Sequence, residues 1–136
     1  NKIPYIFVNT NSKNYENNIL LNLKKYKINF ICLAGYMKII SGNLIKNYPK
    51  KIINIHPSLL PKFKGLNTFS KILKNKEVKT GCTVHYVNEK LDSGNIIHKK
   101  MFFIKSKDNE LVLKRKTQKL EYRAFPEAII KIFRNI

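Results

Sequence analysis

The stretch Asn54-Ile-His-Pro-Ser-Leu-Leu-Pro-Lys-Phe-Lys-Gly65 carries the most information about this chain. With the apolar residues ahead of it, it predicts a short strand over residues 51–56. Alternate residues of a strand share a face, so we expect the side chains of Asn54 and His56 to lie together. Pro57 lacks a backbone donor and keeps His56 extended, so the strand should end there. An amide and an imidazole are thus predicted at the carboxyl end of a strand, where open α/β sheets bind ligands.

A second segment, residues 81–97, supplies a carboxylate. Asp92, one of two aspartates in the chain, stands just before the turn-forming pair Ser93-Gly94. Together with Asn54 and His56 it can form an acid/base centre, in which the aspartate holds the ring and stabilises its protonated form while the amide donates to an oxyanion. A purely structural role for a single histidine at a strand end remains the alternative.

The remaining pattern predicts alternating strands and helices. Strands are expected at residues 3–8, 29–34, 51–56, 80–87 and 95–104, and helices at 15–26, after 41, at 66–75 and from 108 onward. Asn14 and Ser41 are expected to cap the first two helices, and Pro126 to break or kink the last. This order predicts one α/β domain over residues 1–136, with a doubly wound, mostly parallel sheet and an antiparallel part near the C-terminus.

Composition favours a cytoplasmic protein with a packed core. Hydrophobic residues make up 43% of the 136, and no apolar run is long enough to span a membrane. No signal peptide is visible at the start of the chain. Cys32 and Cys82 lack metal-ligand spacing, so we expect both to be reduced and buried, and we expect no metal site.

The net charge of +19 raises the alternative of a basic module that binds nucleic acid. Only three of the 27 basic residues are arginine, and the lysines are spread along the whole chain. Specific nucleic-acid sites favour clustered arginine beside stacking aromatics, a pattern that is not found here. We therefore expect no specific nucleic-acid partner.

The two motifs resemble those of a known enzyme family. The segment Asn54 to Pro61, then Gly65-Leu-x-Thr68, then His85 followed by Leu91-Asp92-x-Gly94, is similar to the phosphoribosylglycinamide formyltransferases of the folate-dependent formyltransferase superfamily. The resemblance implies formyl transfer from 10-formyltetrahydrofolate to glycinamide ribonucleotide, a step of purine synthesis. It also implies an N-terminally incomplete copy, which lacks the first strand, the phosphate loop, and the following helix and strand of the family. Whether this chain is active by itself is left open.

The resemblance assigns roles residue by residue. Asn54 would bind the formyl oxygen and its oxyanion, His56 would donate a proton, and Asp92 would support His56. Glu121 matches a residue that touches the glycinamide substrate. The expected folate-binding residues are Met37, Lys38, Ile39, Ile40, Asn54, Val87, Asn88, Glu89 and Asp92. His85 is expected to be structural, packed between strands.

Related enzymes remain alternatives. Methionyl-tRNA formyltransferase shares His-Pro-Ser-Leu-Leu-Pro, but differs after the shared glycine, where this chain has Leu66-Asn67-Thr68. Formyltetrahydrofolate deformylase usually has a second histidine where Pro57 stands. The partners expected in each reading include a folate, and the oligomeric state is left open.

Overall fold

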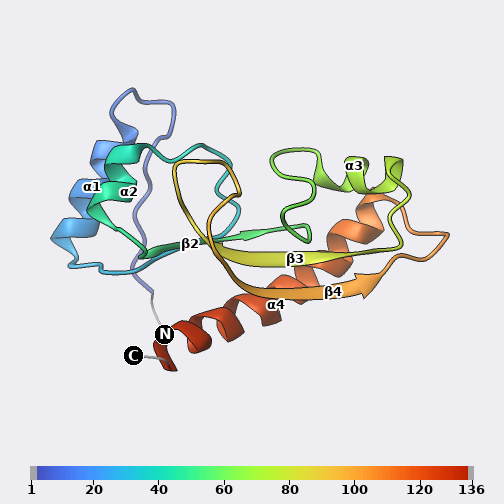
Figure 1. The fold of residues 1–136 in the computed structure, drawn as a ribbon. Coiled ribbons are helices and arrows are strands. Elements are labelled where there is room, and N and C mark those ends of the chain that lie inside the picture. Colours follow the sequence, from blue (N-terminus) through green and yellow to red (C-terminus); the bar gives the residue numbers. More distant parts are fainter. Residues whose placement is uncertain (1–2, 135–136) are drawn as a thin grey trace.

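The computed structural model describes residues 3–134, which contain four helices and four strands (Figure 1). The helices are α1 (Tyr15–Lys25), α2 (Gly42–Asn47), α3 (Thr68–Lys74) and α4 (Glu110–Arg134); the strands are β1 (Ile31–Leu33), β2 (Ile52–His56), β3 (Lys79–Tyr86) and β4 (Ile96–Phe103). These elements confirm every expected helix and all expected strands but one, with boundaries that shift by a few residues.

The four strands form a mixed sheet in the order β1-β2-β3-β4. Strands β1 and β2 are parallel, with Ile31 opposite Ile52, whereas β2–β3 and β3–β4 are antiparallel. The α/β class is therefore confirmed, but the parallel share among the described strands is smaller than expected. The reason is that β3 runs antiparallel to both of its neighbours, and β4 follows β3 through one loop without a helical crossover.

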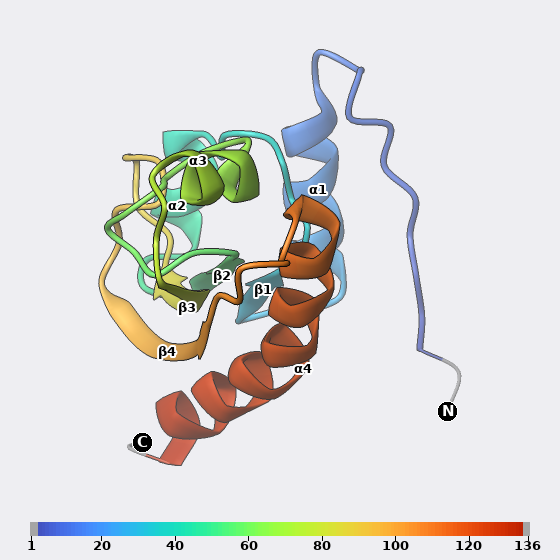
Figure 2. The same cartoon turned by 90° about the vertical axis from the view of Figure 1, so that its right-hand side faces the viewer.

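Two hydrophobic clusters lie on opposite sides of β2. Ile53 is fully buried in the cluster that α4 covers with Ala124 and Ala128. Ile52, the preceding residue, is 1% exposed and belongs to the other cluster, which includes Leu44 of α2. Figure 2 shows α4 on one side of the sheet and α2 and α3 on the other. Because alternate residues of a strand point to opposite faces, β2 contributes side chains to both clusters.

The expected strand over residues 3–8 is wrong, because this segment has no strand pairing in the structure. Its side chains are open to solvent, with Tyr5 93% and Phe7 86% exposed. In Figure 2 it runs apart from the sheet. Apolar residues alone do not make a strand, since a strand also needs a hydrogen-bonding neighbour or a face to cover.

The long C-terminal helix does not end at Pro126, because α4 continues through this residue, so of the expected break or kink the break is wrong. Proline removes one helical hydrogen bond, but Pro126 is exposed and the buried residues Ala124 and Ala128 hold the helix to the sheet on both sides of it. Tertiary packing therefore outweighs the local cost.

Two smaller expectations, on helix caps and on cysteines, are each confirmed at one residue and wrong at another. The hydroxyl of Ser41 accepts from the amide of Leu44 at 3.4 Å, as expected of a helix cap, whereas the Asn14 side chain makes no such bond. Cys82 is buried as expected, but Cys32 is exposed. Strand β1 has only three residues and leaves this side chain uncovered, so the expectation that Cys32 is buried is wrong.

Candidate active site

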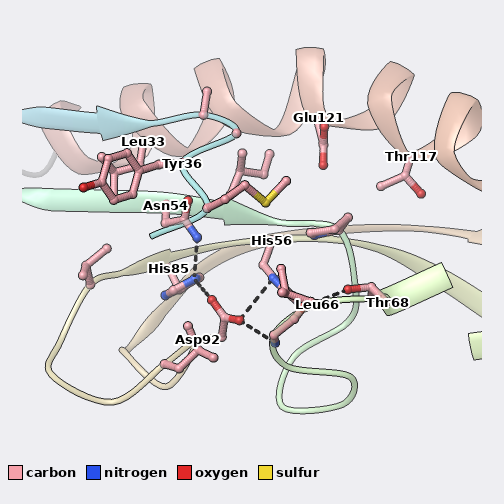
Figure 3. A pocket seen from close by; sticks show the side chains of 18 of the residues that line it. Leu33, Tyr36, Asn54, His56, Leu66, Thr68, His85, Asp92, Thr117 and Glu121 are labelled. Atoms are coloured by element: carbon pink, nitrogen blue, oxygen red, sulfur yellow. Dashed lines mark hydrogen bonds and ion pairs between the residues drawn. The ribbon is translucent and has the colours of Figure 1, made fainter. Parts of the chain in front are cut away.

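An open cavity of about 740 Å³ lies beyond the carboxyl ends of the parallel strands β1 and β2. One part of the cavity is lined by residues 33–40, which end β1 and continue beyond it, and its floor is formed by residues 54–57 at the end of β2. Residues 65–69, residues 87–92 and one face of α4 complete the wall. Figure 3 shows the polar side chains of the floor gathered beneath α4. The cavity thus occupies the edge at which α/β sheets usually bind ligands.

Every residue that the sequence placed at the site lines this cavity. These residues are Met37, Lys38, Ile39, Ile40, Asn54, His56, Val87, Asn88, Glu89, Asp92 and Glu121. They come from four separate segments, which the fold brings together. Their shared location is an observation, and their chemical roles remain predictions.

His56 and Asp92 form a buried pair at the floor of the cavity. Nδ1 of His56 lies 3.3 Å from Oδ2 of Asp92, and their side chains are 7% and 8% exposed. Nε2 of the same ring lies 2.8 Å from the carbonyl oxygen of Phe63. Because both neighbours are acceptors, a ring that carries a proton on each nitrogen would satisfy both contacts. The two acceptors therefore hold the His56 ring in a fixed orientation beside the cavity.

The loop between β2 and α3 holds this pair in place. The amide of Gly65 donates to Oδ2 of Asp92 at 2.8 Å. The same loop is also bound to β3. The hydroxyl of Thr83, on β3, donates to the Ser58 carbonyl at 2.7 Å and accepts from the Leu60 amide at 3.1 Å. Thr83 is fully buried. These bonds join the loop to β3. The sheet therefore helps to fix the loop that carries the Phe63 carbonyl oxygen beside His56.

A tight turn presents the carboxylate. Asp92 adopts a left-handed backbone conformation with φ of 46°, which aspartate tolerates better than most residues. Two residues on, a Cβ on Gly94 would lie 1.7 Å from the carbonyl oxygen of Tyr86. Only glycine fits this approach, which keeps the turn against the end of β3.

His85 belongs to the site although the sequence indicated only a structural role. It is 2% exposed, and its Nε2 lies 3.5 Å from Nδ2 of Asn54 and 3.7 Å from Oδ1 of Asp92. Burial lowers the pKa of His85, while the nearby Asp92 opposes this shift. The strand register, which sets His85 opposite Asn54, is the signal that could have revealed this placement.

The outer rim of the cavity is apolar and open. Met37 is 79% and Ile39 72% exposed, although Ile40 turns inward and is 8% exposed. Lys38 points away, since its Nζ donates to the Thr10 carbonyl at 2.7 Å. The rim therefore offers apolar surface that a bound ring could cover.

One face of α4 forms the roof, and most of it was missed by sequence reasoning. Figure 3 shows Glu121 and Thr117 directed from the helix toward the floor. Burial raises the pKa of Glu121. The hydroxyl of Thr117 is buried and has no hydrogen-bond partner among the residues described. Helical spacing links Thr117 to Glu121 four residues later, but only the known position of α4 shows which face lines the cavity.

Two negative observations apply to residues 3–134. They contain no group of three or more His, Cys, Asp or Glu side chains placed to hold a metal ion. None of their helices has the length and apolar character needed to cross a membrane.

The chain belongs to the formyl transferase family, whose model matches residues 6–129. Among curated proteins it is similar to the trifunctional purine biosynthetic protein adenosine-3 of Gallus gallus, with 44% identity over 107 residues. That match covers 79% of this chain and 11% of the chicken protein.

Solved structures agree with this placement. The phosphoribosylglycinamide formyltransferase from Bacillus halodurans has a TM-score of 0.83 and 38% identity, over 87% of this chain and 61% of that one. A formyltetrahydrofolate deformylase from Pseudomonas syringae has a TM-score of 0.87 but 26% identity, over 93% of this chain and 44% of that one. The chain thus spans about a tenth of the chicken relative and about three fifths of the Bacillus structure.

Proposed function

We propose that this chain forms the catalytic domain, residues 1–136, of an enzyme that transfers a formyl group from 10-formyltetrahydrofolate to the amine of glycinamide ribonucleotide. The observation that carries the proposal is the buried His56–Asp92 pair beside Asn54 at the floor of an open cavity. Membership of the formyl transferase family and similarity to phosphoribosylglycinamide formyltransferases support this reading.

The reaction forms a bond from the substrate amine to the formyl carbon and breaks the bond from that carbon to a folate nitrogen. Asn54 would donate its amide N–H to the formyl oxygen as negative charge develops there. His56 would give a proton toward the departing nitrogen, directly or through a water, and Asp92 would stabilise the charged ring. The proton released by the amine would restore His56 in the next step.

The two parts of the cavity suit two different ligands. The rim residues Met37 to Ile40, together with Val87, Asn88 and Glu89, would contact the folate. Among them, the exposed apolar side chains of Met37 and Ile39 fit a flat ring that loses water on binding. Glu121, on the roof, would bind the glycinamide amine through its carboxylate. Free cysteines fit a reducing, cytoplasmic setting for this metabolism.

A formyl-transfer assay with three acceptors tests the proposal. The full-length protein that contains this chain is given 10-formyltetrahydrofolate with glycinamide ribonucleotide, with methionyl-tRNA, or with water alone as the acceptor. We expect turnover that depends on glycinamide ribonucleotide. Formate release without any amine would instead indicate a deformylase, and transfer to the tRNA would indicate the tRNA enzyme.

The matched negative control is His56→Ala, purified in the same way, so that a trace contaminant cannot be mistaken for the chain. Activity that the variant retains in full would contradict the proposed centre.

A further inference from the structure

We propose that His85 is a positioning residue that fixes which way the amide of Asn54 faces, by accepting a hydrogen bond from Nδ2 of Asn54. The role of Asn54 toward a formyl oxygen rests on the function proposed above. The orientation itself does not, and it can be measured separately.

The first step concerns the tautomer of His85. Its Nδ1 lies 2.8 Å from the backbone carbonyl oxygen of Tyr86. A carbonyl oxygen can only accept, so Nδ1 must carry the proton. In a neutral ring with that proton, Nε2 is an acceptor.

The second step concerns what Nε2 faces. Nδ2 of Asn54 is 3.5 Å away, a long contact that suits a weak donor–acceptor pair. Oδ1 of Asp92 is 3.7 Å away, which exceeds hydrogen-bonding distance. Asn54 and His85 are direct partners in the β2–β3 ladder, so the backbone fixes their approach.

The surroundings favour a neutral ring. His85 is 2% exposed, and burial lowers its pKa. Among the charged groups nearby, Asp92 acts to raise the pKa, whereas His56 and Lys64 act to lower it. We therefore infer a neutral His85 ring with its proton on Nδ1, the form that makes hydrogen bonds both to the Tyr86 carbonyl and to Nδ2 of Asn54.

A neutral His85 ring would decide which of two orientations the Asn54 amide adopts. The donor and acceptor ends of this amide have nearly the same shape, so only hydrogen bonding decides between the two orientations. With Nδ2 turned to His85, a second N–H of the same nitrogen stays available for an oxyanion. A protonated His85 would present N–H to the amide and favour the flipped form, in which Oδ1 takes the place of Nδ2.

Nitrogen-15 NMR of the full chain labelled on histidine tests the tautomer without any assay. We expect His85 to show a protonated Nδ1 and an unprotonated Nε2 at neutral pH. The inference is overturned by the opposite tautomer, or by a doubly protonated ring. Neither result depends on whether the chain transfers formyl groups.

A double-mutant cycle tests the coupling to Asn54. His85→Leu removes the acceptor, whereas His85→Gln returns an oxygen acceptor near the former Nε2. We expect His85→Leu to lower kcat roughly tenfold with little change in the folate KM, less than the loss of a whole oxyanion donor. His85→Gln should recover most of that loss.

In an Asn54→Ala background, His85→Leu should cause almost no further loss. If His85→Leu instead lowered kcat by the same factor in the Asn54→Ala background as in wild type, the positioning role would be overturned and His85 would be a packing residue. If the Leu variant fails to fold, the Gln variant and the tautomer measurement still decide the matter. If the full-length protein that contains this chain shows no formyl transfer, the proposed function fails while the tautomer result stands by itself.

Discussion

The end of β2 and the rim of the cavity differ in how firmly their side chains are held. At the end of β2, the side chains of His56 and of its partner Asp92, from the turn between β3 and β4, are almost fully buried and are held by the backbone of the loop that follows β2. At the rim, Met37 and Ile39 are mostly exposed. This difference matches two different tasks. Groups that stabilise a transition state are most effective when their geometry is fixed before the reaction. An exposed apolar surface contributes to binding because a flat ring that covers it removes apolar area from water.

The largest effect should come from the reaction centre. His56→Ala and Asp92→Asn should each lower kcat by about 10²- to 10⁴-fold, because general acid–base help is lost or the ring is no longer supported. Steady-state kinetics of formyl transfer measure this. His98→Ala is the matched control, since His98 lies on β4 and bonds only Glu127 among the contacts described. A variant at His56 or Asp92 with near wild-type turnover would contradict the division between centre and rim.

Asn54→Ala should have the next largest effect, about 10²- to 10³-fold on kcat, because an oxyanion donor acts mainly in the transition state. Binding of a folate analogue, followed by calorimetry, should change little. Equal losses in kcat and in binding would show instead that Asn54 serves ground-state binding.

Glu121→Gln should weaken the apparent affinity for the amine substrate by about 10- to 100-fold, because a charge-assisted hydrogen bond becomes neutral. Burial raises the pKa of Glu121, so this carboxylate takes up a proton at a higher pH than an ordinary glutamate. In wild type, affinity should therefore fall as the pH falls through that raised value.

The amide in Glu121→Gln cannot titrate, so the variant should lack that part of the pH dependence. KM for the amine substrate, measured from neutral to mildly acidic pH, checks both points. The same pH dependence in both proteins would assign it to another group.

The smallest effect belongs to the rim. Met37→Ala should weaken binding of a folate analogue by about 1–2 kcal/mol, or about 5- to 30-fold in Kd, with kcat nearly unchanged. Leu21→Ala on α1 is the control, because Leu21 is 66% exposed and lies outside the cavity. If Met37→Ala instead lowered kcat as strongly as Asn54→Ala, centre and rim would not be separate.

Much of the site was predictable because strand geometry is local. Asn54 and His56 are two residues apart on a predicted strand, and Pro57 marks its end, so their shared face follows from period-2 alternation. Asp92 was predictable from the turn that follows it. The β3–β4 hairpin was likewise visible as two patterned segments around one loop.

What remained hidden depends on contacts between distant residues. The partnership of His85 with Asn54 requires the register of β2 against β3, which no local pattern specifies. The face of α4 toward the cavity depends on how the helix lies on the sheet. The segment at residues 3–8 has the composition of a strand but no neighbour to pair with, so its composition was misleading.

The shared position of β2 between two hydrophobic clusters has a consequence for hydrogen exchange. Ile52 and Ile53 are held from opposite sides, so the amides of this strand can exchange only when both clusters open. Their exchange rates should therefore report the free energy of unfolding of the whole domain. Residues 36–39 of the rim lie outside any helix or strand, and their amides should exchange through small local openings. A ligand that covers the rim would slow that local exchange at once, and would slow exchange in β2 only as far as it stabilises the folded chain.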